Sequence, residues 1–326
     1  MSILRNSRRS FFYLCSAAAT SRGVTLAALS RPTLKRIKMV TVGVHDIESF
    51  FRQYSRWLGY KLVDKGVVCE ALSLSWSMHD AFNKPYIVLC PESGADVYIR
   101  AIETQSSINL KPFRHGGWVA IEILVSDLDL VYQKLKGAPF AIIAPPKSIV
   151  AGSPIRAMQV MGLAGEVLYL TESGGDRAAL NHPEPKSLVD RIFIVVLAGG
   201  SAESIEHYYS SVFNLNLQGN YQFSIDLLSN AHGLPDNHVY NFSVLSGSEI
   251  GNKIEIDEYP EKFAKPMETG SSIPSGFFMV TFETDFITRS GIDFVSPPAM
   301  LYQNLYAGTI IGPVGEKIEV VSDTFI

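Results

Sequence analysis

The side chains most able to do chemistry stand inside short apolar runs that read as β-strands. Glu122 lies in WVAIEILV, residues 118 to 125, and Arg100 lies in VYIRAI, residues 97 to 102. Alternate residues of a strand face the same side of a sheet, so such groups can converge on one concave face. A carboxylate in an apolar concavity has a raised pKa and can act as a general base, while a guanidinium can hold an oxyanion or carboxylate.

The first half of the chain predicts a small-molecule site around Glu122. An apolar concavity with a few convergent polar groups is the usual design of such a site. Glu122 and Tyr169 are its candidate catalytic residues. The candidate substrate-binding residues of this half are Tyr98, Arg100, Trp118 and Arg156. Either arginine is also explained by a buried Glu–Arg pair that only neutralises two charges.

The second half carries another polar cluster. Arg191 is a candidate substrate-binding residue, and it is grouped with Glu255, or its same-face neighbour Asp257, and with Glu319. The alternative for this cluster is an internal salt-bridge network without a substrate. His238 flanks a Gly-Leu-Pro-Asp loop and is a further catalytic candidate, because imidazole exchanges a proton near neutral pH.

The elements that must position these residues recur four times. The run MVTVGVHDIESFFRQYSRWLGYKLV begins at Met39, and RIFIVVLAGGSAESIEHYYSSVFNLNL begins at Arg191 with the same strand, turn and helix. The order strand, helix and three strands also restarts at Gly117 and, with almost no helix, at Gly276. Such duplication predicts units that bury a core together. We predict a leader at 1–33, an N-terminal domain at 34–173, a linker at 174–188 and a C-terminal domain at 189–326.

Four such units, with Asp-Ile or Asp-Leu opening the first helices, resemble the vicinal oxygen chelate superfamily, which includes glyoxalase I, extradiol dioxygenases and fosfomycin and bleomycin resistance proteins. AGEVLYLTE from Ala164 and PVGEKIEV from Pro313 are similar to the glycine turn and final strand of these domains. The resemblance implies an α+β fold in which four βαβββ units form two tandem glyoxalase-like domains, with curled mixed sheets around concave pockets. A fold of this kind hosts many reactions, so function depends on the pocket.

Catalytic members of that superfamily hold a divalent metal with first-strand residues, usually His, and a last-strand Glu. In this chain the positions that correspond to those ligands hold other residues in most cases. They are Met39, Ala120, Arg191 and Phe278 in first strands, and Tyr98 or Arg100, Tyr169, Glu255 and Glu319 in last strands. Only Glu255 and Glu319 are metal-ligand candidates, and an arginine beside them pairs naturally with the carboxylates. We therefore expect a lost metal site and no cofactor, with a bound divalent ion as the alternative.

The leading functional hypothesis is an enzyme of this glyoxalase- and dioxygenase-like superfamily that works without a transition metal. Its substrate would be a small aromatic or apolar oxygenated compound, and its chemistry proton abstraction of the lyase or isomerase kind. One alternative is a non-catalytic protein that sequesters a small molecule. The other is a metal-dependent extradiol-type dioxygenase or glyoxalase with atypical ligands.

Composition limits the classes of partner that the protein can bind. The net charge of −4 provides no basic field for nucleic acid, and no apolar run reaches the roughly 20 residues of a membrane span. A homodimer is a possible assembly state.

The leader predicts where the protein is located. It lacks acidic residues and contains SRRSFF from Ser7, which resembles a twin-arginine export signal. We expect a bacterial periplasmic protein, with mitochondrial or cytoplasmic location as alternatives.

Overall fold

The computed structural model describes residues 33–326 except 109, 151, 267 and 289–290. The predicted export signal falls outside the described residues. Within them the chain folds into the four predicted units, and the α+β fold class is confirmed. None of the helices in this part of the chain is long and apolar enough to cross a membrane.

The first two units follow the predicted order of elements. Unit one comprises β1 (Leu34–Val44), α1 (Ile47–Gln53) with its continuation η1 (Tyr54–Leu58), β2 (Lys61–Val67), α2 (Glu70–Ser75), η2 (His79–Ala81), β3 (Pro85–Cys90) and β4 (Tyr98–Glu103). Unit two comprises β5 (Gly117–Val125), α3 (Leu128–Leu135), β6 (Ala141–Ser148), β7 (Ile155–Met161) and β8 (Val167–Ser173).

The last two units repeat this order, although the fourth is shortened. Unit three comprises β9 (Val189–Gly199), α4 (Ala202–Phe213), β10 (Asn216–Ser224), α5 (Asp226–His232), β11 (Val239–Ser246), β12 (Lys253–Glu258) and η3 (Glu261–Phe263). Unit four comprises β13 (Gly276–Thr284), β14 (Ala299–Tyr302), β15 (Leu305–Ile311) and β16 (Lys317–Ser322). Its described residues contain no helix between the first two strands, as the sequence predicts.

Side-chain caps start the first helix of three units. Asp46, Asp127 and Ser201 each accept a hydrogen bond from the backbone N–H three residues later, at 2.9, 2.8 and 3.2 Å. This satisfies one of the N–H groups that lack a partner at a helix start. In unit four, Asp285 instead accepts hydrogen bonds from the backbone N–H groups of Thr33 and Phe286. Asp285 therefore fixes the start of the described chain to unit four.

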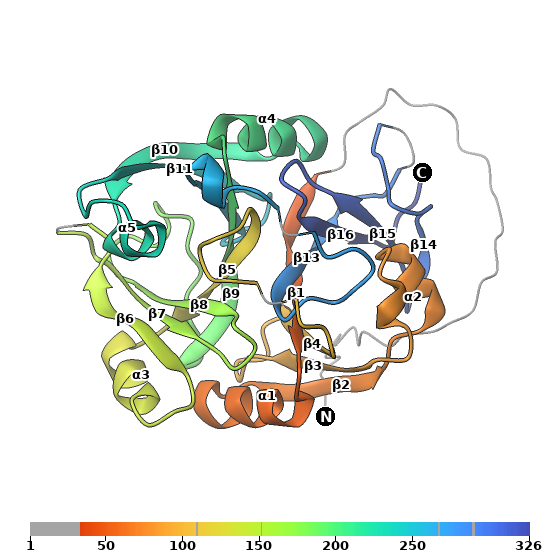
Figure 1. The fold of residues 1–326 in the computed structure, drawn as a ribbon, viewed down its shortest axis with the longest axis horizontal. Helices are drawn as coiled ribbons and strands as arrows, with labels where there is room; N and C mark the ends of the chain where they lie inside the picture. Colours follow the sequence, from red (N-terminus) through yellow and green to blue (C-terminus); the bar gives the residue numbers. More distant parts are fainter. Residues whose placement is uncertain (1–32, 109, 151, 267, 289–290) are drawn as a thin grey trace, which may run out of the picture.

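The units pair crosswise along the chain. One sheet, here called the outer sheet, joins units one and four in the order β14-β15-β16-β13-β1-β4-β3-β2. The other, the inner sheet, joins units two and three in the order β10-β11-β12-β9-β5-β8-β7-β6. Figure 1 shows this as orange and blue strands in one lobe and yellow and green strands in the other. The consecutive pairs 34–173 and 189–326 therefore do not each close a sheet of their own.

Three large apolar clusters follow from this arrangement, beside a small one of Leu124, Phe193 and Ile194. The largest contains residues of β1, β5, β9 and β13 together with α1, α3 and α4, so it joins the two sheets and their helices into one core. A second fills the opposite face of the outer sheet, where α2 packs with Trp76. A third lies on the opposite face of the inner sheet, beneath α5 and η3. We call these two opposite faces the concave faces.

Two buried Tyr–Glu hydrogen bonds connect the two sheets, one in each half of the chain. Tyr54 of unit one donates to Glu166 of unit two at 2.9 Å, and Tyr209 of unit three donates to Glu316 of unit four at 2.8 Å. Both glutamates are almost fully buried, and burial raises the pKa of each to about 7. Each half of the chain therefore braces its own two units, although those units belong to different sheets.

Candidate functional site

The strand register gathers three acidic side chains and a tyrosine on the concave face of the inner sheet. Glu122 on β5 lies beside Tyr169 on β8, and Glu255 on β12 lies beside Val196 on β9. Along each strand these polar residues alternate with residues of the core between the sheets. Their side chains therefore point to the opposite, concave side. Asp257 follows Glu255 by two residues and shares its face. The site is thus assembled from units two and three.

Like charges and burial set the proton affinity of this carboxylate cluster. Burial, then the charge of Glu255, raises the pKa of Glu122 to about 8, although Glu122 accepts a 2.6 Å hydrogen bond from the Thr171 hydroxyl. Burial likewise raises the pKa of Glu255 to about 7, against the charge of Lys253. The pKa of Asp257 is raised well above its usual range by burial and then by both glutamates. Asp257 therefore keeps its proton and hydrogen bonds to Glu255.

Several polar atoms around the cluster are buried without a hydrogen-bond partner among the described residues. They are Asp257 Oδ1, the Tyr259 hydroxyl and Gln159 Oε1. Gln159 lies beside Tyr169 in the register of β7 and β8, and Tyr259 continues the alternation of Glu255 and Asp257. An unpartnered buried polar atom costs about 1–3 kcal/mol, so three in one place indicate room for a partner that binds there.

Tyr169 and Glu255 are partly accessible although both lie on interior strands of the sheet. Space for at least a water-sized group therefore adjoins them. The surroundings are largely aromatic: Phe113, Phe223, Tyr240, Phe242, Tyr259 and Phe263 belong to the cluster on this face or pack against it. Burial, then the three carboxylates, holds the pKa of Tyr169 well above its usual range, so its phenol stays a hydrogen-bond donor.

His232 supports this face, and His238 lies at its margin. The ring of His232 contacts the Phe113 carbonyl at 2.7 Å and the Tyr240 hydroxyl at 3.0 Å, and it stacks on Phe263. His232 is therefore a buried structural residue that keeps the aromatic side chains over this face in place. His238 is half-buried and meets the ring of Tyr240 edge-on at 4.7 Å. The predicted proton-transfer role of His238 stays a prediction.

The corresponding face of the outer sheet is filled by a complete ionic network. Arg100 lies beside Thr41, and Glu319 lies beside Thr281, in the same register positions as the residues of the inner site. The Arg100 guanidinium donates to Thr41 at 2.9 and 3.1 Å, to the Tyr302 hydroxyl at 2.8 Å and to Glu319 at 3.3 Å.

The partner carboxylate of this network is equally well satisfied. Glu319 accepts hydrogen bonds from the Trp76 indole at 2.7 Å, from Thr281 at 2.6 Å and from Tyr302 at 2.7 Å. Arg100 also stacks on the Trp76 ring, and both charged side chains have no exposed surface. Glu319 therefore belongs to a buried ion pair, but its partner is Arg100 and not Arg191, and Glu255 lies in the other sheet.

Neither face offers a good donor set for a metal ion. The four central positions of the outer sheet hold Thr41, Arg100, Thr281 and Glu319, so a guanidinium takes the middle of the site. In the inner sheet Val196 provides no donor, and Asp257 engages Glu255. Among the described residues no group of three or more His, Cys, Asp or Glu is arranged to hold a metal. Glu255 and Glu319, the two ligand candidates, lie in different sheets.

The crosswise pairing corrects the predicted first pocket. Tyr98 and Arg100 belong to the outer sheet, whereas Glu122, Arg156 and Tyr169 belong to the inner sheet. The Tyr98 hydroxyl donates to Asp96 at 2.8 Å. Arg156 lies on the same face of β7 as Met158 and Val160, which belong to the core between the sheets, and it pairs with Asp129 of α3 and with Glu172, so it lies on the convex side. Only Glu122 and Tyr169 of that group meet at one site.

Two further predicted residues also lie elsewhere. Trp118 packs in the core between the sheets, where its indole donates to the Lys317 carbonyl at 2.8 Å. Arg191 precedes the segment of β9 that pairs with β12, and Glu319 is in the other sheet, so Arg191 joins neither carboxylate. Sequence reasoning missed Gln159 and Tyr259. Tyr259 follows the alternation from Glu255, which is a signal the sequence contains.

Solved structures of known proteins share the fold of this chain. No family model matches the sequence, and no curated protein matches it. Glyoxalase I from Zea mays superposes with a TM-score of 0.60 at 15% identity, over 88% of this chain and 92% of that one. A protein from Bacillus subtilis described as a proposed dioxygenase gives a TM-score of 0.59 at 12% identity, over 89% of this chain and 86% of that one. At such low identity these similarities concern the fold alone.

Proposed function

We propose that this chain, which has the fold of the vicinal oxygen chelate superfamily, is an enzyme that transfers protons on a small aromatic or apolar oxygenated compound. The reaction takes place on the concave face of the inner sheet, and no transition metal takes part. The observation that carries the proposal is the pair of buried, unpartnered atoms, Asp257 Oδ1 and the Tyr259 hydroxyl, beside two carboxylates of raised pKa.

The two glutamates divide the acid and base roles. Glu255 has the lower pKa and is partly accessible, so near neutral pH it is the group that can accept a proton from substrate carbon. Glu122 has the higher pKa and is the group that can return a proton. When a C–H bond beside a carbonyl breaks, its electron pair moves to the carbonyl oxygen, which the Tyr169 phenol can stabilise by a hydrogen bond. Reprotonation at a neighbouring atom then completes an isomerisation.

The charge of the site favours an uncharged substrate. Three acidic side chains face the same space, and the ammonium of Lys253 is occupied by the Leu180 carbonyl at 2.7 Å. A carboxylate ligand would be repelled by ionised Glu255 and would lack a cationic partner. Unpartnered acceptors such as Asp257 Oδ1 instead favour a ligand with hydroxyl groups.

The alternative is a protein that sequesters the same class of compound. The aromatic cover formed by α5 and η3 favours it, because aromatic walls supply affinity whether or not chemistry follows. In that case the carboxylates would only hold hydroxyl groups of the ligand.

Hydrogen–deuterium exchange separates the two functions. Purified protein is incubated in D₂O with a panel of neutral aromatic ketones and hydroxyketones, and deuterium uptake at the carbon beside the carbonyl is followed by NMR. We expect uptake that falls about 10²–10⁴-fold in Glu255→Gln. Glu172→Gln, a carboxylate change on the convex side of β8, is the matched control and should keep the rate. Saturable binding of panel members without any exchange would support sequestration instead.

A further inference from the structure

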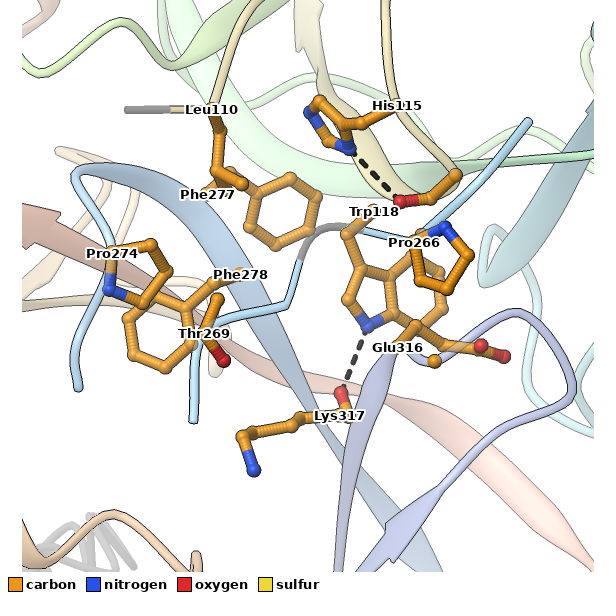
Figure 2. Close-up of a pocket in the computed structure, with 13 residues that line it drawn as sticks. Leu110, His115, Trp118, Pro266, Thr269, Pro274, Phe277, Phe278, Glu316 and Lys317 are labelled. Carbon is orange, nitrogen blue, oxygen red and sulfur yellow. Dashed lines mark hydrogen bonds between the residues drawn. The ribbon is translucent and has the colours of Figure 1, made fainter. Parts of the chain in front are cut away.

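A pocket lies where the two sheets meet, and none of the acidic-site residues lines it. It is formed by the start of β5 in the inner sheet, by β13 and β16 of the outer sheet, and by the three segments that lead into these strands (Figure 2). Its walls are mainly apolar, with Trp118, Phe277, Phe278, Leu110, Pro266 and Pro274 among the lining residues. Because its walls come from both sheets, this seam pocket exists only in the assembled four-unit fold.

Lys317 is the cationic group of the seam pocket. Its ammonium donates a 2.9 Å hydrogen bond to the Trp76 carbonyl, which leaves two of its three protons for other partners. Within the described residues no carboxylate forms an ion pair with it, and its side chain is only half-buried. Burial alone lowers its pKa, which is the sign of a cation that has lost water without gaining a counter-charge.

The other titratable groups of the seam pocket do not neutralise Lys317. The Nδ1 of His115 faces the Gly116 carbonyl at 2.9 Å, and burial lowers the pKa of this ring, so it stays neutral. The carboxyl of Glu316 accepts hydrogen bonds from Tyr209 and from the Val314 N–H. Figure 2 shows this carboxyl pointing away from Phe277 and Phe278. One uncompensated positive charge therefore remains in an aromatic pocket.

We propose that the seam pocket binds a small monocarboxylate with an aromatic or apolar body. The carboxylate pairs with the Lys317 ammonium, and the body of the ligand packs between Phe277, Phe278 and Trp118. A single cation matches a single negative charge, whereas a phosphate dianion would enter with one charge unmatched. This site is opposite in charge preference to the inner site, and it does not depend on the proposed reaction.

The experiment uses the full chain and the fluorescence of Trp118, which lines the seam pocket. Benzoate is titrated against the wild-type protein, with benzyl alcohol and inorganic phosphate as matched probes. We expect a saturable change with benzoate and at least tenfold weaker binding of benzyl alcohol and phosphate. Lys317→Met should weaken benzoate binding at least tenfold, while Lys265→Met, an exposed lysine near the pocket, should leave it unchanged.

Two further measurements locate the ligand. Trp118→Phe should remove most of the fluorescence change, whereas a benzoate-dependent rise in Tm should persist, because binding to the folded state stabilises it. Phe278→Ala should weaken benzoate binding with Lys317 intact. Equal binding of benzoate and benzyl alcohol, or benzoate binding that survives Lys317→Met, would overturn the proposal. If Lys317→Met does not fold, the wild-type comparison of benzoate with benzyl alcohol decides the question alone.

Discussion

Replacing Arg100 with Met tests whether the outer concave face is held by its ionic network. The change keeps most of the side-chain volume but leaves Glu319 fully buried without its cation. It also removes the donor to the Thr41 hydroxyl and to Tyr302. Breaking a buried ion pair by removing one partner costs about 3–5 kcal/mol. We expect Arg100→Met to lose stability in that range.

An exposed ion pair on the same protein provides the matched control. Arg156 pairs with Asp129 at 2.8 Å, but its side chain is 35% exposed and that of Asp129 is 67% exposed. Such surface pairs contribute about 0–1 kcal/mol, so Arg156→Met should shift the urea unfolding midpoint several times less than Arg100→Met. Removing both charges in Arg100→Met with Glu319→Gln should recover much of the loss, because no unpaired charge then remains.

Equilibrium urea unfolding followed by circular dichroism measures these three variants. The free energy of unfolding comes from linear extrapolation, provided that the slope stays the same between variants. Equal losses for Arg100→Met and Arg156→Met would refute the reasoning, since the buried network would then contribute no more than a solvated pair. A double variant less stable than Arg100→Met would also contradict it.

Three other predictions concern the assembly and its acidic groups. Because the pKa values of Glu166 and Glu316 rise from their usual 4.5 to about 7 on folding, stability should fall as pH rises from 5 to 8; Glu166→Gln should flatten that fall in urea titrations at fixed pH. Residues 34–187 expressed alone should stay unfolded by circular dichroism, since each sheet lacks a unit, and adding 188–326 should restore the folded spectrum. Asp257→Asn should reduce the fall in stability as pH rises, in the same urea titrations, because the raised pKa of Asp257 makes its ionisation in the folded protein unfavourable and an amide does not ionise.

The sequence predicts the secondary structure of each unit, but it does not predict which units share a sheet. Alternation and capping residues such as Asp46 and Asp127 are local signals, so strands, helices and the shortened fourth unit could be predicted. Pairing between first strands is different, because β1 and β5 read alike and each can form an antiparallel pair with another first strand. The crosswise arrangement depends on strand pairs far apart in the chain, such as β1 with β13, which one sequence does not reveal.

The same limit applies to the candidate site, where contacts within one unit could be predicted and contacts between units could not. Glu122 and Tyr169 meet because they belong to one unit, where strand alternation and register are enough. Arg100 and Glu319 lie 219 residues apart, and their pairing depends on the order of strands in the outer sheet. The face of Arg156 could not be predicted, because both alternating sets of residues in Ile155–Met161 contain apolar side chains and the sequence does not show which set packs in the core.

The contrast between the two concave faces is the physical reason to locate the chemistry in the inner sheet. The outer face pairs Arg100 with Glu319 and so leaves neither of these two charges unpaired, although the Thr309 hydroxyl beside Glu319 is buried without a hydrogen-bond partner among the described residues. The inner face places Glu122, Glu255 and Asp257 together, which costs folding free energy through burial and repulsion. Stored strain and unpartnered polar atoms are typical of functional sites, where a ligand or a reaction uses what folding alone does not favour. A site kept only for stability would have been neutralised, as the outer face is.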